Sequence, residues 1–431
     1  MSSEWPAMLL EDCLDALIDY RGKTPEKTTS GVPLVTAKII KGGRIERPSE
    51  FIAEAAYDAW MRRGIPQAGD VVLTTEAPMG EVGQLGRDRV ALAQRVVTLR
   101  GKAGLLDSTF LLYLLQTDGM QEQLRARATG TTVLGIKQSE LRRISVPLPP
   151  IGLQRSSASV LAAIDKRIDV LRETNATLEA IAQALFKSWF VDFDPVRAKQ
   201  QGIAPAGMDE ATAALFPDGF EESTLGLLPK GWRAAALSEV FEINPLRSLK
   251  KGASAPYLDM ASLARSGHCV EPPVQREFGS GAKFRNGDTL LARITPCLEN
   301  GKSAFVDFLA EEQVGWGSTE FIVLRPKNRI PEYLGYLLCR YPPFREYAIH
   351  SMSGTSGRQR VQNDVLGRYL LAMPGAAIAS AFGEIVAALH KSITANHAQA
   401  QTLATLLDTL LPRLISGQLR LPYAEALAEL D

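Results

Sequence analysis

The chain has 431 residues, of which 45% are hydrophobic, and this length corresponds to two or three domains with real cores. Lys plus Arg equals Asp plus Glu at 48 each, which excludes a histone-like or tail-driven nucleic-acid binder and leaves only local basic clusters. Four cysteines without CxxC spacing argue against a disulfide framework. An acidic N-terminal stretch, without a long apolar run anywhere in the chain, predicts a cytoplasmic protein that does not cross a membrane.

The segment from about Leu10 to Phe190 recurs in degenerate form from about Ala236 to Ile415. GDVVLTTEAPMGEVG matches GDTLLARITPCLENG, QRVVTLR matches EFIVLRP, FLLYLL matches YLGYLL, and ATGTTVLGIK matches MSGTSGRQRV. A period of more than 200 residues is far too long for a solenoid repeat. The sequence therefore predicts a domain duplication.

In chain order, residues 1–150 mix short β-branched runs with turn residues, and SEFIAEAAYDAWMRRG (49–64) predicts a short helix. Residues 151–190 predict a long helix. Residues 191–231 are rich in Pro, Gly and acidic residues and are interpreted as a connector. Residues 232–375 repeat the pattern of the first globule, residues 376–415 predict a second long helix, and residues 416–431 form a C-terminal tail.

Each long helix carries apolar residues at alternating steps of three and four, which is the seam of a coiled coil. The first seam comprises Leu161, Ile164, Ile168, Leu171, Asn175, Leu178, Ala182, Leu185 and Trp189. The second comprises Val386, Leu389, Ile393, Asn396, Ala400, Leu403, Leu407, Leu410 and Leu414. The alternative is that each helix simply docks on its own globule.

An antiparallel pairing that sets Asn175 opposite Asn396 makes every other layer apolar, for example Leu161 with Leu410 and Leu178 with Ile393. We expect this polar layer to fix the register at some cost in stability. Pro412 is expected to end or kink the second helix, because its ring disrupts the preceding turn.

The run PLPPIGLQRSSASVLAAIDKRIDVLRETNATLEAIAQALFKSWFVDFDPVRAK, with FPDGFEESTLGLLPKGW and the terminal LLPRLISGQL, closely resembles the specificity (S) subunit of Type I restriction-modification systems. The resemblance covers nearly the whole chain. It implies an α+β fold with two tandem α/β target-recognition domains, 1–150 and 232–375, joined by two long helices that form an antiparallel coiled coil in a pseudo-two-fold internal repeat.

The same resemblance implies that each recognition domain reads one half of a bipartite double-stranded DNA target while the helices set the separation. Two methyltransferase (M) subunits would dock on the helical regions, and restriction (R) subunits would join them if the host has them. The resemblance implies no cofactor in this chain, with S-adenosylmethionine, ATP and Mg on the partner subunits. The complex would be a DNA adenine methyltransferase and ATP-dependent endonuclease.

Base reading needs donors and acceptors on loops that reach a groove, with Arg or Lys favoured for guanine and Asn or Gln for adenine. The first pair of candidate loops offers Thr131, Thr132 and Lys137 in one half and Arg358, Gln359 and Arg360 in the other. The second pair offers Thr75 and Glu76, and Arg293, Asn300 and Lys302. Weaker candidates are Lys38, Lys41, Arg44, Trp316, Ser318 and Thr319. Each residue taken singly is equally well explained as an ordinary solvated loop residue, and the basic ones could only neutralise phosphate.

The chain lacks a convincing catalytic or metal constellation. Tyr341-Pro-Pro-Phe344 resembles the motif of amino-methyltransferases, but tyrosine replaces the residue that must bind the target amine. The four histidines are too dispersed for a triad or a zinc site. A scaffold protein without DNA reading remains an alternative, although a scaffold has no need for two divergent copies with polar Gly-Thr loops. That divergence predicts two unlike half-sites.

Overall fold

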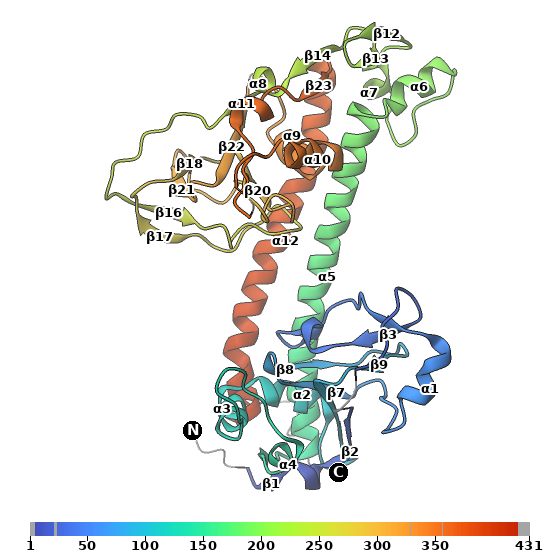
Figure 1. The fold of residues 1–431 in the computed structure, drawn as a ribbon, viewed down its shortest axis with the longest axis vertical. Coiled ribbons are helices and arrows are strands. Elements are labelled where there is room, and N and C mark those ends of the chain that lie inside the picture. The colour runs from blue at the N-terminus through green and yellow to red at the C-terminus, as the bar shows by residue number, and fades with distance from the viewer. Residues whose placement is uncertain (1–4, 21–23, 328, 356, 421–431) are drawn as a thin grey trace. The chain divides into compact units, whose positions relative to one another are not determined.

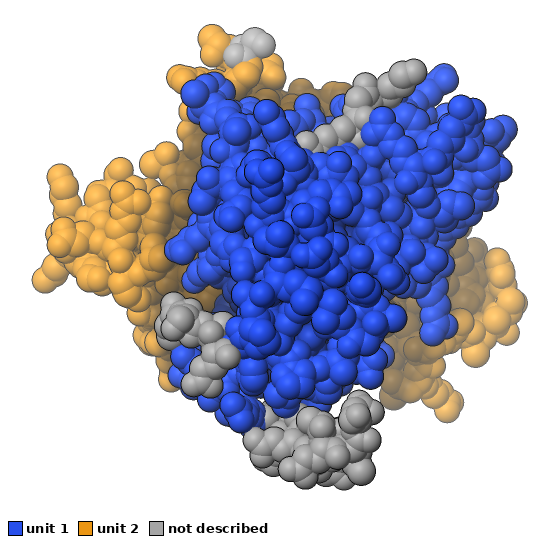
Figure 2. Space-filling view, turned by 90° about the horizontal axis from the view of Figure 1, so that it is seen from below, with its two compact units in different colours: residues 1–169, 401–431 blue, residues 170–400 orange. Residues whose placement is uncertain are grey.

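The computed structural model describes residues 5–20, 24–327, 329–355 and 357–420. The chain divides into two compact units, coloured separately in Figure 2: unit 1 comprises residues 1–169 and 401–431, and unit 2 comprises residues 170–400. Two long helices, α5 (Ile151–Phe190) and α12 (Ala376–Ser416), each contribute one part to each unit. The units therefore cut across both helices, whereas the domains expected from the sequence end where the helices begin.

Unit 1 contains a globule of short elements in front of α5 (Figure 1). Its strands are β1 (Ala7–Leu9), β2 (Leu14–Asp19), β3 (Val32–Val35), β4 (Ile40–Lys41), β5 (Arg44–Ile45), β6 (Phe51–Ile52), β7 (Val71–Thr75), β8 (Met79–Gln84), β9 (Ala91–Leu92), β10 (Val96–Gly101) and β11 (Ser145–Pro147). Its helices are α1 (Tyr57–Trp60), α2 (Ser108–Gln116), α3 (Asp118–Ala126) and α4 (Gln138–Arg142), with short 3-10 turns at Leu10–Cys13, Ala37–Ile39 and Glu54–Ala56.

Unit 2 contains the second globule, together with the segment between the two halves. Its strands are β12 (Phe220–Ser223), β13 (Gly226–Pro229), β14 (Arg233–Ala236), β15 (Phe241–Ile243), β16 (Ser254–Leu258), β17 (Val274–Glu277), β18 (Ala282–Phe284), β19 (Thr289–Ala292), β20 (Ser303–Phe305), β21 (Gly315–Gly317), β22 (Phe321–Pro326) and β23 (Leu370–Met373). Its short helices are α6 (Asp194–Gln200), α7 (Glu210–Leu215), α8 (Leu237–Val240), α9 (Leu334–Arg340), α10 (Pro342–His350) and α11 (Asn363–Leu366).

The two globules share one topology. The central sheet has the order β2-β10-β7-β8 in unit 1 and β15-β22-β19-β20 in unit 2, with every neighbouring pair antiparallel. A smaller sheet in each unit includes one parallel pair, β3 with β9 and β16 with β21. A separate antiparallel pair, β1 with β11 or β14 with β23, completes each globule. The duplication predicted from the sequence is therefore a duplication of fold.

Buried central strands position the loops that follow them. All five residues of β7 and all four of β19 are buried, and each strand packs beneath a helix of mainly buried residues, α2 or α9. Strands covered on both faces have nearly continuous hydrophobic sequences, which is why VVLTT and TLLA lack polar alternation. Loops that leave such a scaffold are held at defined places, as binding loops require.

The two long helices pack against each other within each unit. In unit 2, the Asn396 side-chain amide donates a 2.9 Å hydrogen bond to Asn175 Oδ1, and the Asn175 amide donates to the carbonyl of Ile393 at 3.0 Å. In unit 1, Leu161 lies in one cluster with Leu414. The predicted pairing of the two asparagines is thus present, and the direction of the pairing is antiparallel. Every predicted seam position is buried or half-buried.

Three sequence expectations need correction. The predicted helix over 49–64 is shortened to the 3-10 turn Glu54–Ala56 followed by α1, because Phe51–Ile52 pairs with β3 as strand β6. Pro412 does not end α12, which continues to Ser416. The side of the helix at Pro412 is exposed, where a bend is least costly.

The segment of residues 191–231 is not a bare linker. It forms α6, α7 and the β12–β13 hairpin, and it contributes Phe193 to the core of unit 2. Most of the predicted C-terminal tail, from residue 421, lies outside the described residues.

Among the described residues, α12 alone is long and apolar enough to cross a membrane by length and composition, with 28% of its most apolar window buried. Core helices of soluble proteins meet the same criterion. The seam residues of α12 are used in packing on α5, as the pairing of Asn396 with Asn175 shows.

Candidate nucleic-acid interface

The two candidate loops of unit 2 are joined into one surface. The first follows β19 and spans residues 292–301, and the second follows α10 and spans residues 352–361. Ile294 and Arg360 form a β-bridge. The Thr295 N–H donates to the Gln359 carbonyl at 3.1 Å, and the Val361 N–H donates to the Arg293 carbonyl at 3.0 Å. Side chains that the sequence placed on separate loops therefore lie on one face.

Unit 1 joins the corresponding segments in the same way: residues 74–83, which comprise the end of β7, the turn and most of β8, and the loop of residues 128–137. Glu76 and Gly135 form the equivalent bridge, and the Ile136 N–H donates to the Thr75 carbonyl at 3.0 Å. The tip of the second loop closes on itself through a pair of backbone hydrogen bonds between Thr129 and Gly135, at 2.8 and 2.9 Å. The duplication thus extends to the pairing of the loops, while their side chains differ.

In each unit an arginine–glutamate ion pair ties one loop to the residue before a central strand, with opposite polarity and on different loops: the loop after α10 in unit 2 and the loop after β7 in unit 1. In unit 2 the arginine is on the loop and the glutamate precedes the strand: Arg360 contacts both carboxylate oxygens of Glu320 at 2.6 to 2.9 Å. In unit 1 the glutamate is on the loop and the arginine precedes the strand: Arg95 Nε lies 3.0 Å from Glu76 Oε1. The hydrogen bond from Arg360 lowers the pKa of Glu320, against a smaller opposing effect of burial. The sequence analysis missed Glu320 and Arg95, although both occupy the same place in the repeat, directly before β22 and β10.

The other candidates in unit 2 differ in how free their side chains are. Arg358 is exposed, and the part of the chain that the structure describes gives its guanidinium no ion pair. Arg293 Nη2 donates to the Gln362 amide at 3.3 Å. Lys302 Nζ donates to the Met260 carbonyl at 2.7 Å, so it braces a loop. The remaining candidates in unit 2 are exposed or half-buried: Asn300, Ser318, Thr319 and Gln359.

In unit 1, three separate candidate segments surround one recess of about 760 Å³. It is lined by Gly42–Gly43, from the segment that contains Lys41 and Arg44, by Ala77–Val82 after β7, and by Thr132–Leu134 of the Gly-Thr loop. Gln116, Gln121 and Arg125 complete the lining. An adjoining recess of about 300 Å³ includes Glu76 and Lys137. Thr131, Thr132 and Lys137 are exposed, as are Lys38 and Lys41, and Lys41 lies 3.5 Å from Glu46.

Two candidates are buried and do not present a side chain to a ligand. Thr75 is the last residue of β7 and is 2% exposed, so its contribution is the carbonyl that anchors the second loop. Trp316 is 5% exposed, and its indole N–H donates to the Arg276 carbonyl at 3.3 Å. Both expectations are corrected: these residues shape the globules.

Arg44 also has a role other than the expected one. Its guanidinium contacts Asp165 at 2.8 Å and Asp169 at 2.9 Å, and both carboxylates belong to α5. The Tyr113 hydroxyl donates to Asp165 at 2.7 Å, and burial raises the pKa of this phenol. These contacts fasten the globule of unit 1 to the helix.

Unit 2 uses the same device with different partners. The Tyr336 hydroxyl donates to Glu179 of α5 at 2.6 Å, and Arg340 Nε lies 3.5 Å from the same carboxylate. Tyr336 and Tyr113 are the aromatic residues that match in the FLLYLL and YLGYLL segments. In each unit, a tyrosine and an arginine of the globule therefore contact carboxylates of α5 and fix the globule to this helix.

A buried ion pair also supports each central sheet. Asp70 accepts two hydrogen bonds of 2.8 Å from Arg100 in unit 1. Asp288 accepts from Arg247 at 2.6 and 2.7 Å and from Arg325 at 3.4 Å in unit 2. The sequence contained the signal, because Gly-Asp and Leu-Arg are matched landmarks of the repeat, but it was not interpreted as a contact.

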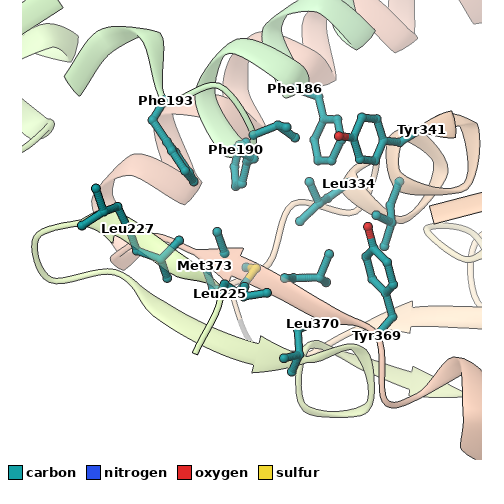
Figure 3. A pocket seen from close by; sticks show the side chains of 15 residues that line it. Phe186, Phe190, Phe193, Leu225, Leu227, Leu334, Tyr341, Tyr369, Leu370 and Met373 are labelled. Atoms are coloured by element: carbon teal, nitrogen blue, oxygen red, sulfur yellow. The ribbon is translucent and has the colours of Figure 1, made fainter. Parts of the chain in front are cut away.

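An apolar groove lies in unit 2 at the C-terminal end of α5 (Figure 3). It has a volume of about 230 Å³ and is lined by Phe186, Phe190, Leu334, Tyr341, Tyr369 and Met373, with the β12–β13 leucines along one side. Leu225, Leu227 and Leu370 at its edge are 40%, 63% and 41% exposed. Unit 1 has a counterpart of about 570 Å³ at the C-terminal end of α12, lined by Ile415, Ser416, Leu114 and Pro147.

These features define a class: a duplicated α+β protein in which paired polar loops, one set in each unit, are carried on buried sheets fastened to long helices. Residues 31–180 match the model of the Type I restriction modification DNA specificity domain. The MjaIX specificity subunit of Methanocaldococcus jannaschii is 25% identical over 92% of this chain and 89% of its own length. The HindI specificity subunit of Haemophilus influenzae is 33% identical over 27% of this chain and 26% of its own length.

A crystal structure of the S subunit of a Type I restriction-modification system from M. genitalium has the same fold, with a TM-score of 0.58, 17% identity and 96% coverage of both chains. Residues 31–180 thus match a Type I restriction modification DNA specificity domain, and the chain is similar to a Type I restriction enzyme specificity subunit over nearly its whole length, in agreement with the resemblance found in the sequence.

Proposed function

We propose that this chain recognises an asymmetric, bipartite double-stranded DNA target, with one half-site for each unit. The observation that carries the proposal is the pairing of two polar loops at the same place in both units, with unlike side chains on an identical backbone plan. Residues 74–83 and 128–137 carry two glutamates and one lysine, a net charge of −1. Residues 292–301 and 352–361 carry three arginines and one glutamate, a net charge of +2. Loops of unlike chemistry read unlike bases.

The test is selection from a random duplex library, with the chain co-purified with the methyltransferase subunit encoded beside it, at near-physiological salt. We expect two short, unlike motifs across a fixed unspecified gap. Salt-sensitive binding without an enriched motif would contradict DNA reading and would leave the alternative, a scaffold built on the helices.

In this proposal α5 and α12 set the distance between the half-sites. The anchors on Asp165 and Glu179 fasten each globule to a helix, so a change in helix length moves a reader as a body. Inserting three heptads in each helix adds about 32 Å, close to the 34 to 36 Å of one turn of B-DNA. We expect the unspecified gap to lengthen by about nine base pairs, with both half-sites unchanged. A changed half-site would contradict the role of the helices as a spacer.

We further propose that the two apolar grooves each receive one methyltransferase subunit. The grooves occupy the same place in the two units, at the end of a long helix and beside the strand pair β14–β23 or β1–β11, so a partner that fits one has a second site in the other. Exposed leucines beside an apolar hollow are typical of a protein interface. Restriction subunits, where present, would join this assembly.

Stoichiometry tests the grooves. Leu227→Asp combined with Leu370→Asp places two charges at the edge of the unit 2 groove, and we expect the complex measured by native mass spectrometry to fall from two methyltransferase subunits per chain to one. The matched control is Leu246→Asp, because Leu246 is a fully exposed leucine elsewhere in unit 2. Two bound subunits in the double variant would contradict this docking site.

The chain itself acts by recognition in this proposal. S-adenosylmethionine, ATP and Mg belong to the partner subunits, and the assembled complex is proposed to methylate adenine and, with restriction subunits, to cleave DNA. This assignment places the protein in the cytoplasm with the DNA it reads.

A further inference from the structure

The side chain of Arg360 is held in one orientation by Glu320. Its Nε donates to Glu320 Oε1 and Oε2 at 2.9 and 2.8 Å, and its Nη2 donates to Oε1 at 2.6 Å. The backbone of Arg360 is fixed as well, because its N–H and carbonyl pair with Ser353 at 2.9 and 3.0 Å. The Arg360 side chain is nevertheless 40% exposed, against 23% for Glu320. Glu320 and the backbone pairing therefore fix the orientation of Arg360, while part of its side chain remains exposed to solvent.

The contacts leave two of the five guanidinium N–H donors available. An arginine has five N–H donors in a planar fork. Glu320 occupies the edge formed by Nε and one N–H of Nη2, and the Arg358 carbonyl accepts from Nη1 at 3.3 Å. One further N–H remains on each terminal nitrogen. Two donors on neighbouring nitrogens match in number the two acceptors, O6 and N7, that guanine shows in the major groove.

We propose that Arg360 reads a guanine in the half-site of unit 2, and that Glu320 is the positioning residue that holds it for this contact. The proposal rests on the proposed function, since it names a base within that target. It assigns two different tasks to neighbouring arginines of one loop: Arg360 specifies a base, and Arg358 binds the phosphate backbone.

Charge separates these two tasks. Affinity for phosphate comes from net positive charge and the release of counterions, and the carboxylate of Glu320 cancels the charge of Arg360 at a distance of 2.6 Å. A paired arginine is a poor phosphate ligand, but a well-oriented donor is what base discrimination requires. Arg358 is exposed and has no ion pair among the described residues, so its full charge is available to a phosphate.

The ion pair of unit 1 does not support the same inference. Arg95 approaches Glu76 through a single contact of 3.0 Å, and the two side chains are 49% and 47% exposed. Arg95 is therefore not held by a bidentate contact of the kind that fixes Arg360. The proposal is therefore limited to unit 2.

The experiment is the random duplex selection with the complex of this chain and its methyltransferase subunit, repeated for three variants. Arg360→Gln replaces the guanidinium fork with an amide, which favours adenine over guanine. We expect it to lose preference for guanine at one position of the unit 2 half-site by about 5- to 150-fold, which corresponds to the 1–3 kcal/mol of a bidentate base contact. Glu320→Gln should relax the same position and no other. The matched control, Arg358→Ala, should weaken binding to all sequences about equally and reduce the salt slope by about 1.

A fourth variant separates reading from loop stability. Arg360→Glu combined with Glu320→Arg restores the ion pair with reversed polarity. If the pair only braces the loop, this swap keeps the guanine in the selected motif, and the proposal is overturned. If Arg360 reads guanine, the swap removes that base from the motif although the loop stays tied. A motif unchanged by Arg360→Gln would also overturn the inference while leaving the bipartite function intact, whereas the absence of any motif for the unaltered chain would mean that the proposed function itself fails.

Discussion

Units 1 and 2 share their strand order, their paired loops, their anchors to the helices and an arginine–glutamate pair between loop and strand, but they differ in which element carries the positive charge. Unit 1 places Glu76 on the loop and Arg95 before the strand. Unit 2 places Arg360 on the loop and Glu320 before the strand. Only the residue before the strand is matched between the units, because Glu76 lies on the loop after β7 whereas Arg360 lies on the loop after α10. The surface that results is different, because the loop of one unit offers acceptors and the loop of the other offers donors.

The comparison shows how one fold can acquire two specificities. The buried ion pairs and the tyrosine anchors recur because they maintain the scaffold, whereas the side chains at the loop tips are free to diverge. A residue that is matched between the units is therefore a candidate for stability, and a residue that is unmatched is a candidate for recognition. The predictions below test this division.

The largest expected effect comes from the buried carboxylates. Asp288→Ala leaves Arg247, which is 10% exposed, and Arg325 without their shared partner, and we expect a loss of about 3–5 kcal/mol in unit 2, as for a broken buried ion pair. Asp70→Ala leaves Arg100, which is 24% exposed, without its carboxylate partner. Unit 1 should therefore lose less stability, about 1–3 kcal/mol. Hydrogen exchange of the β19–β22 and β7–β10 amides measures the two effects separately. Equal losses, or a loss in the unaltered unit, would contradict a scaffold maintained independently in each unit.

The next largest effect is expected in the packing of α5 on α12, which differs between the units. The polar layer of Asn175 and Asn396 belongs to unit 2, and the described seam of unit 1 contains apolar layers. Asn175→Leu leaves the Asn396 amide without its partner, and we expect it to cost about 1–3 kcal/mol. Leucine at both positions should restore or increase stability while it relaxes the register. Thermal unfolding of the single and double variants checks this, and an unchanged single variant would mean that the layer has no role.

Loop charge should act in opposite directions in the two units. Arg358→Gln in unit 2 removes a free cation and should lower non-specific DNA affinity. Glu76→Gln in unit 1 removes an anion and should raise that affinity about 1.4-fold to fivefold, the 0.2–1 kcal/mol typical of an exposed charge pair. Titrations against a DNA that lacks the target measure both. Changes of the same sign would show that the loops do not face DNA.

The smallest effect is a pH dependence confined to unit 2. Because the pKa of Glu320 is lowered in the folded protein, the ion pair with Arg360 contributes stability above the ordinary glutamate pKa and loses it as pH falls through the lowered value. Amide protection in residues 352–361, corrected for intrinsic exchange, should stay constant from pH 7 to about 5 and fall below about pH 4. In Glu320→Gln that fall should be absent. Protection that rises on acidification would contradict the assigned sign.

Much of this organisation could be predicted from sequence, because it depends on periodic patterns. Steps of three and four predicted both long helices and the facing of Asn175 and Asn396, and the matched landmarks predicted the duplicated globules. The patterns did not reveal which polar residues were already paired. Arg44 was selected as a free cation, but Asp165 and Asp169, more than 100 residues away in the sequence, neutralise it.

The missed partners have a common cause. Trp316 appears in a polar GWGST segment, but β21 places it inside its sheet. Glu320 precedes a strand and has no motif of its own, and its role depends on a loop 40 residues later. Contacts between distant segments depend on the tertiary register of strands and loops, which a single sequence does not specify. The sequence therefore located the loops better than it ranked their members.

The central claim, one independent reader in each unit, is tested most directly by duplex selection on three forms of the complex. These are the unaltered chain, a Glu76→Ala/Arg95→Ala variant of unit 1 and a Glu320→Ala/Arg360→Ala variant of unit 2. We predict two unlike motifs for the unaltered chain, and for each variant the degradation of one motif, a different one in each case, with the other motif and the gap retained. Identical motifs in the unaltered chain, or degradation of both motifs by either variant, would contradict the account.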